Sequence, residues 1–205
     1  MNSNILIDVL PQHVKINGKT YKINSDFRTS MVFEMMINDS ELSNEEKTNV
    51  ALDLYYTKIP CERDLAVEAI IWFYSCAKKE QEASGGNSRT RNSSRKNNRI
   101  YDYELDAEYI YSAFLDQYGI DLQDIKYLHW WKFRALFKSL KEDNQIVKIM
   151  GYRSVDITKD MSKEQKDFYK KMKKLYEIPK SKTEKEKIND IEKALLNGGD
   201  LSDIL

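Results

Sequence analysis

The chain has 205 residues, enough for one large domain or two small ones, and its 33 basic and 33 acidic side chains give a formal net charge of zero. Only 7 glycines and 3 prolines occur, which disfavours sandwiches and barrels because those folds need many turns. Since the charges cancel over the whole chain, a preference for nucleic acid or for an anionic surface would require a local basic patch.

The N-terminal part predicts a small sheet. Residues 5–9, ILIDV, predict a short strand. Residues 14–23 predict a hairpin, because Asn17-Gly18 suits a type I′ turn and apolar residues alternate on both sides of it. The start of the chain has no basic segment followed by a long apolar run, so we expect no signal peptide. Since no run of 18 apolar residues occurs, we also expect no transmembrane helix.

Helical patterns follow this predicted sheet. Ser25 or Asp26 can cap a first helix, and Ser43-x-x-Glu46 is a capping box that opens a second. Pro60 marks the expected start of a third helix, whose apolar residues recur at helical spacing. We therefore expect a mainly α fold with a small N-terminal β-hairpin.

The composition changes after residue 78. Residues 79–98 show no hydrophobic periodicity and predict a flexible basic linker between an N-terminal part, residues 1–78, and a C-terminal helical domain, residues 99–205. From position 78 to position 99 there are seven basic and two acidic residues. Such a run is either a solvated tether or a nucleic-acid contact, and the contact would be made by Arg89, Arg91, Arg95 and Lys96.

The C-terminal half predicts further helices. A helix over residues 106–118 should end at Gly119 in a left-handed conformation, and a second helix should cover residues 121–140. Residues 151–157 predict a loop or a short extended piece. A capping box at Ser162-x-x-Gln165 opens a helix that reaches about residue 177, and Thr183-x-x-Glu186 opens a last helix.

The predicted helix over residues 121–140 contains the densest aromatic cluster of the chain. At 100° per residue, His129 falls in the middle of its apolar arc and Trp130 at the rim, whereas Trp131 falls clear of the arc. We therefore expect His129 to be a buried, hydrogen-bonded core residue rather than a ligand or an acid–base group. Trp131 should be covered either by another helix of this chain or by a partner.

Catalytic and metal-binding patterns are weak. The alternating carboxylates Asp102, Glu104, Asp106 and Glu108 could serve acid–base or metal chemistry. Asp106 and Glu108 also suit a helix N-terminus, the interpretation that we favour. No HExxH, CxxC, nucleophile motif or glycine-rich phosphate loop occurs. We therefore expect no enzyme, no catalytic residues, no cofactor and no metal.

The predicted helix over residues 162–177 has a lysine face and an apolar face. Its lysines are Lys163, Lys166, Lys170, Lys173 and Lys174, and its apolar residues are Phe168, Met172, Leu175 and Tyr176. A basic amphipathic helix can bind nucleic acid or a membrane surface, but a solvated face on a packed helix is the interpretation that we favour.

The chain resembles the bacteriophage "gene product fifteen" family of siphophage tail morphogenesis proteins in two C-terminal blocks, YDYELDAEYIYSAFLDQYGIDLQDIKYLHWWKFRALFKSL and KIMGYRSVDITKDMSKEQKDFYKKMKKLYEIP. The N-terminal segments INSDFRTSMVFEMM and LSNEEK…LDLYYTKIP resemble it as well. The resemblance covers most of the chain except the linker.

This resemblance implies a non-enzymatic phage protein, similar in role to tail assembly chaperones. Such a protein binds the tape-measure and tail-tube proteins in the cytoplasm of the host bacterium during assembly, and self-association is open. A structural virion or tail-joint component is the alternative. For protein-binding contacts we select large aromatic residues, which bury much area at interfaces: Trp130, Trp131, Phe133 and Tyr152.

Overall fold

The N-terminal hairpin forms as the sequence predicts. The computed structural model describes residues 4–77 and 99–179, and in it β1 (His13–Ile16) pairs antiparallel with β2 (Lys19–Lys22). Asn17 and Gly18 take φ angles of 48° and 77°, the left-handed values that a type I′ turn requires. Val14 and Ile16 are buried, so one face of β1 contributes to the core.

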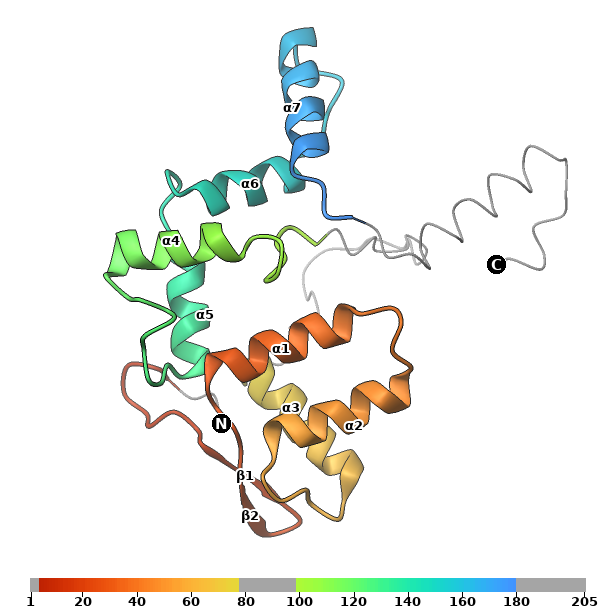
Figure 1. The fold of residues 1–205 in the computed structure, drawn as a ribbon, viewed down its shortest axis with the longest axis vertical. Coiled ribbons are helices and arrows are strands. Elements are labelled where there is room, and N and C mark those ends of the chain that lie inside the picture. Colours follow the sequence, from red (N-terminus) through yellow and green to blue (C-terminus); the bar gives the residue numbers. More distant parts are fainter. Residues whose placement is uncertain (1–3, 78–98, 180–205) are drawn as a thin grey trace, which may run out of the picture.

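Helices make up most of the described residues, so the predicted fold class is confirmed: mainly α with a small N-terminal sheet. Figure 1 shows their arrangement, with α5 standing between α4 and the N-terminal helices and α7 extending away from α6. In chain order the helices are α1 (Phe27–Asn38), α2 (Asn44–Tyr55), α3 (Arg63–Tyr74), α4 (Ala107–Tyr118), α5 (Trp130–Lys138), α6 (Gln145–Ser154) and α7 (Lys163–Leu175).

The predicted helix caps are present. The Asp26 side chain accepts a hydrogen bond from the Arg28 N–H at the start of α1. Capping boxes open α2, where Ser43 pairs with Glu46, and α7, where Ser162 pairs with Gln165. Gly119 ends α4 with a φ of 63°, as expected for a left-handed residue after a helix. Short-range signals therefore placed these four helix ends well.

Two N-terminal predictions are wrong. Residues 5–9 form no strand but a turn, in which the Asn4 carbonyl accepts from the N–H groups of Ile7 and Asp8 at 3.0 and 2.8 Å. An apolar β-prone run still needs a neighbouring strand, and none lies beside this segment in the described part of the chain. The third helix starts at Arg63 rather than at Pro60.

The C-terminal half also departs from prediction in two places. The expected helix over residues 121–140 begins only at Trp130, because the Asp121 carboxylate accepts from the N–H groups of Gln123 and Asp124 and so fixes a turn. Residues 151–154 are not a loop but the last turn of α6. Ile146 and Ile149 are fully buried one helical turn apart, which is the periodic signal that this helix left in the sequence.

His129 is the N-cap of α5 and is buried, which confirms the prediction of a hydrogen-bonded core histidine. Its Nδ1 accepts from the Trp131 N–H at 3.1 Å, so the proton sits on Nε2, which donates to the Pro11 carbonyl at 3.0 Å. Burial lowers the pKa of His129 below its ordinary value of 6.5; the bond to Pro11 opposes this shift and the Lys132 charge adds to it. The neutral ring is therefore the form that the fold holds.

The N-termini of α1 and α5 are joined by backbone hydrogen bonds. Phe27 donates its N–H to the Leu128 carbonyl at 2.9 Å, and Trp130 donates its N–H to the Ser25 carbonyl at 2.8 Å. These bonds flank an antiparallel bridge between Asp26 and His129. Residues more than 100 positions apart thus fix where two helices begin.

Phe133 lies at the centre of an aromatic cluster that joins both halves of the described chain. Its fully buried ring stacks on Phe27 of α1 at 5.1 Å and on Phe114 of α4 at 4.9 Å between centroids. Trp130 and Phe137 extend the stack along α5 itself, at 5.7 and 6.0 Å. One hydrophobic cluster accordingly contains residues from the hairpin through α6.

The hydrophobic core is shared by the two parts into which the sequence divides the chain. Residues of the predicted N-terminal part and of the predicted C-terminal domain pack into one cluster, so in this structure the two parts are in contact. The predicted linker, residues 79–98, and the predicted helix from Thr183 lie outside the described residues.

We expect Phe133→Ala to lower the free energy of unfolding by about 3–5 kcal/mol, because it removes a fully buried ring and leaves a cavity. Urea denaturation followed by circular dichroism measures this loss. Val32→Ala, at a position 47% exposed on α1, is the control and should change stability by less than about 0.5 kcal/mol. Equal losses in the two variants would contradict a central role for Phe133.

The lowered pKa of His129 predicts a pH dependence of stability. As pH falls below 6.5, the unfolded chain takes up a proton before the folded chain does, so the contribution of His129 to stability is lost toward its lower folded pKa. His129→Asn keeps an N-cap acceptor but does not titrate. The difference in free energy of unfolding between wild type and variant should therefore shrink from pH 8 to pH 5. A constant difference would show that His129 is not held neutral.

Candidate functional site

Three of the four predicted contact residues are buried. Trp130, Trp131 and Phe133 expose 1%, 4% and 0% of their surface, so of the two alternatives for Trp131 the structure shows coverage by other helices of this chain, and these three residues are not exposed contacts. Trp131 donates its indole N–H to the Phe73 carbonyl at 2.7 Å, and Trp130 donates to the Tyr74 carbonyl at 2.9 Å. Both tryptophans thus satisfy carbonyl groups at the C-terminus of α3, where helical partners are missing. In this structure they support the fold and offer no contact surface.

The helical projection placed Trp131 outside the apolar arc because it treated residues 121–140 as one helix. Ile125 and Leu128 belong to the apolar arc of that assumed helix, but both precede α5. The other side of α5 is covered as well, since Trp131 contacts the rings of Phe73 and Trp72 at 6.0 and 5.8 Å. A helix with two covered faces has no single apolar arc from which exposure can be read.

The alternative nucleic-acid residues, Arg89, Arg91, Arg95 and Lys96, lie outside the described residues. Within the described ranges, no group of three or more His, Cys, Asp or Glu side chains is arranged to hold a metal ion. None of the described helices combines the length and the apolar content needed to cross a membrane.

A hollow of about 350 Å³ lies between α1, the end of α3 and residues 99–101. The Glu34 carboxylate in its wall accepts a hydrogen bond from the Tyr74 hydroxyl. Burial, reinforced by the Glu34 charge, raises the pKa of Tyr101 to about 12. This phenol is therefore protonated near neutral pH and is poorly suited to act as a base or a nucleophile there.

Asp106 and Glu108 lie at the start of α4 as predicted, Asp106 at the N-cap position and Glu108 in the first turn. Asp106 occupies the N-cap position without a capping bond from its side chain. It is 2% exposed and binds Arg153 with both oxygens, at 2.5 and 3.0 Å. Asp102 forms the local turn, accepting from the N–H groups of Glu104 and Leu105.

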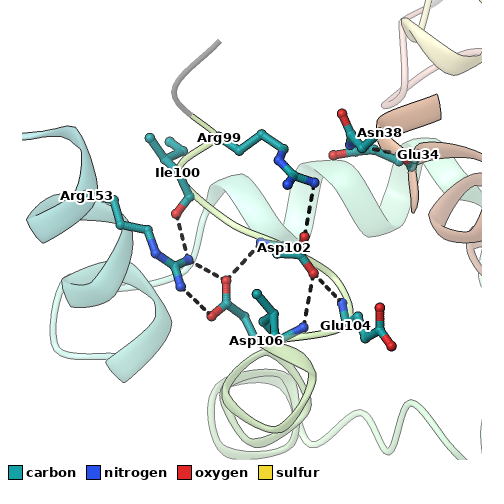
Figure 2. Close-up of polar contacts among 9 residues, drawn as sticks. Glu34, Asn38, Arg99, Ile100, Asp102, Glu104, Asp106 and Arg153 are labelled. Atoms are coloured by element: carbon teal, nitrogen blue, oxygen red, sulfur yellow. Dashed lines mark hydrogen bonds and ion pairs between the residues drawn. The ribbon is translucent and has the colours of Figure 1, made fainter. Parts of the chain in front are cut away.

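Arg153 links several chain segments through one guanidinium group. Figure 2 shows Arg153 facing the Asp106 carboxylate. Its Nη1, which donates to Asp106, also donates to the Ile100 carbonyl at 3.1 Å. Its Nε donates to the Tyr176 carbonyl at 2.6 Å, just after α7. Because Arg153 lies in the last turn of α6, this single side chain fixes α6, the start of α4 and the end of α7 relative to one another.

Helix α7 is the least buried helix of the described chain. None of its residues is buried, and its main packing partner is α6. Figure 1 shows it projecting from α6 away from the other helices. Phe168 and Leu175, on the same side two turns apart, expose 48% and 64% of their surface, and Met172 between them is half-buried. As predicted, α7 packs on another helix and exposes lysines, but it also exposes Phe168 and Leu175 of the apolar face that should have been covered.

Tyr152, the fourth predicted contact residue, lies beside α7. It is half-buried on α6, where its ring meets Phe168 at 5.9 Å and stacks on Tyr176 at 6.0 Å. These ring contacts hold α7 against α6 and leave part of Phe168 exposed. We define the α7 stripe as Phe168, Met172 and Leu175, with Tyr152 as its neighbour on α6. It is the candidate protein-binding surface.

The lysines of α7 surround this stripe. The helix contains six lysines against one glutamate and one aspartate, a formal net charge of +4. Two lysines are engaged locally: Lys173 donates to the Arg153 carbonyl at 3.1 Å and Lys166 to the Lys159 carbonyl at 2.8 Å. The stripe therefore combines exposed apolar area with a basic border, the composition of a surface that binds another amphipathic segment.

Comparison with known proteins identifies one family. A family model described as Bacteriophage Gp15 protein matches residues 6–178, which is most of the chain and includes all seven described helices. A search of curated proteins and a search of solved structures each return no match.

The buried pair of Arg153 and Asp106 predicts a large loss of stability when one partner is neutralised. Asp106→Asn leaves the guanidinium charge buried without its carboxylate and should cost about 3–5 kcal/mol in denaturation experiments. The double variant Asp106→Leu/Arg153→Met should cost less than the sum of the single variants. Asp116→Asn, exposed on the same helix, is the control. Additive losses would argue against coupling.

Proposed function

The chain belongs to the family described as Bacteriophage Gp15 protein, and on this premise we propose that it acts in phage tail assembly as a chaperone-like binding protein. In this proposal it is not an enzyme. It binds the tape-measure and tail-tube proteins in the cytoplasm of the host bacterium while the tail forms. The tape-measure contact is made through apolar helical segments that would otherwise aggregate.

The observation that carries this proposal is the exposed α7 stripe. Helix α7 buries none of its residues, and its apolar side chains Phe168 and Leu175 lie on one side of the helix and stay about half or more exposed, which supports contact with a partner there. Anchors spaced at i, i+4 and i+7 match the pattern by which one amphipathic helix packs on another. The contact residues of the proposal are therefore Phe168, Met172, Leu175 and Tyr152, in place of the buried tryptophans.

We expect the double variant Phe168→Ser/Leu175→Ser to weaken binding to the tape-measure protein of the same phage by more than about tenfold. The loss follows from removing the two most exposed apolar anchors of α7, and calorimetric titration measures it. The melting temperature should fall only slightly, because Leu175 is mostly exposed and Phe168 loses mainly its ring contact with Tyr152. Ile71→Ser, at a position 55% exposed on α3, should leave binding intact.

Two outcomes would count against the proposal at different levels. Undiminished binding by the folded double variant would remove the α7 stripe from the contact, whereas no binding by the wild-type chain would remove the tape-measure protein as a partner. Mass spectrometry of purified particles tests the alternative of a structural virion component, which requires the chain in stoichiometric amounts.

A further inference from the structure

The charge of α7 is uneven along its length. Residues 163–168 contain two lysines, one glutamate and one aspartate, so they are neutral overall. Residues 169–175 contain four lysines and no acidic residue. The part of the α7 stripe around Leu175 therefore lies in a region of +4, and the part around Phe168 does not.

Helix stability explains only part of this charge. Lysines in the last turn, Lys173 and Lys174, interact favourably with the negative end of the helix dipole. Lys170 and Lys171 lie one turn earlier, and both are exposed. Their positive charges lie too far from the C-terminus of α7 to be explained by the helix dipole.

The exposed lysines border the stripe on its free side. With Phe168 as reference and 100° per residue, Leu175 lies about 20° away and Lys171 about 60° away in the same direction, with Lys174 beyond it. The half-buried residues of α7, including Tyr169 and Met172, lie in the opposite direction, toward α6. A ligand seated on Phe168 and Leu175 would therefore meet Lys171 and Lys174 along one edge.

We propose that the ligand of the α7 stripe is an amphipathic helix with an acidic edge, belonging to a partner protein. Its apolar side chains cover Phe168 and Leu175, and its carboxylates lie over Lys171 and Lys174. Charge complementarity fixes the register, because the acidic edge meets the last two turns of α7 and avoids Glu164 and Asp167 in the first turns. This inference rests on the proposed function for the location of the contact and adds the chemistry of the partner.

An anionic membrane surface fits α7 less well. A basic amphipathic helix that binds lipid has apolar residues along its whole length and lysines along both edges. In α7 the exposed anchors are two side chains, one of which also packs on Tyr152, and Glu164 and Asp167 would face the phosphates. A helical peptide can place its charges in register, whereas a lipid surface cannot.

Two synthetic peptides of about 18 residues test the proposal, a length that allows a stable helix. Both carry leucines at i, i+3, i+4 and i+7; one has glutamates along the edges and the other has lysines. Each is titrated into the full chain by fluorescence anisotropy at low and at moderate salt. We expect the acidic peptide to bind more tightly than the basic one, with an affinity that falls as salt rises.

Charge reversal on the stripe should invert this preference. Lys171→Glu/Lys174→Glu should weaken the acidic peptide roughly tenfold and strengthen the basic one. The matched control is Lys58→Glu/Lys126→Glu, which makes the same change in net charge at exposed lysines outside α7 and should have little effect. Phe168→Ser/Leu175→Ser should abolish binding of both peptides.

Several results would overturn the proposal. Equal binding of the two peptides, or an equal loss in the control variant, would show that charge does not select the partner. Binding only to vesicles of phosphatidylglycerol and phosphatidylcholine would assign the stripe to lipid, and a dimer lost in Phe168→Ser/Leu175→Ser would assign it to a second copy. If neither peptide binds while the tape-measure protein still does, this inference is wrong and the proposed function is unaffected.

Discussion

The two indole hydrogen bonds to the end of α3 are the interactions on which the architecture depends. Trp130 and Trp131 are adjacent in sequence, yet both find carbonyl acceptors, on Tyr74 and Phe73, because the start of α5 lies beside the C-terminus of α3. The guanidinium of Arg134 adds a third donor at the Tyr74 carbonyl, at 2.8 Å. With the α3 terminus satisfied in this way, the aromatic rings of α5 can fill the space between the hairpin side and the α4 side of the molecule.

A buried ion pair between Asp106 and Arg153 fixes the helices of the C-terminal part. The carboxylate of Asp106 and the guanidinium of Arg153 are both almost fully buried, and the bonds of Arg153 to Asp106, Ile100 and Tyr176 join separate segments. Such a pair contributes little net stability compared with an apolar replacement, but its geometry admits few alternatives. The orientation of α6 and the exit point of α7 follow from it, and so does the exposure of the α7 stripe.

Local signals predicted the parts of the fold that depend on neighbouring residues. The Asn17-Gly18 turn, the caps at Asp26, Ser43 and Ser162, and the left-handed Gly119 are properties of four or five consecutive positions, and all are present. Predictions failed where distant residues decide. The apolar run at residues 5–9 has no strand beside it, and the start of α5 is set by a bridge to Asp26, more than 100 residues earlier.

The candidate site was harder to predict for the same reason. Tryptophans are enriched both in cores and at interfaces, so composition could not distinguish a donor to α3 from a contact for a partner. The amphipathic pattern of residues 163–175 was visible in the sequence, but whether its apolar face was covered depended on the position of α6. Arg153 gave no signal at all, because its partner Asp106 lies 47 positions away.

The absence of buried side chains in α7 also bears on how this chain can diversify. Residues that fill the core are constrained together, since one ring cannot change without its neighbours, whereas in α7 only the side that packs on α6 is constrained in this way. Under the proposed function, related phages can therefore keep the rest of the fold and vary α7 together with the partner protein that it binds. Cognate pairs would then drift together, and mixed pairs from different phages would fit poorly even though their scaffolds superimpose.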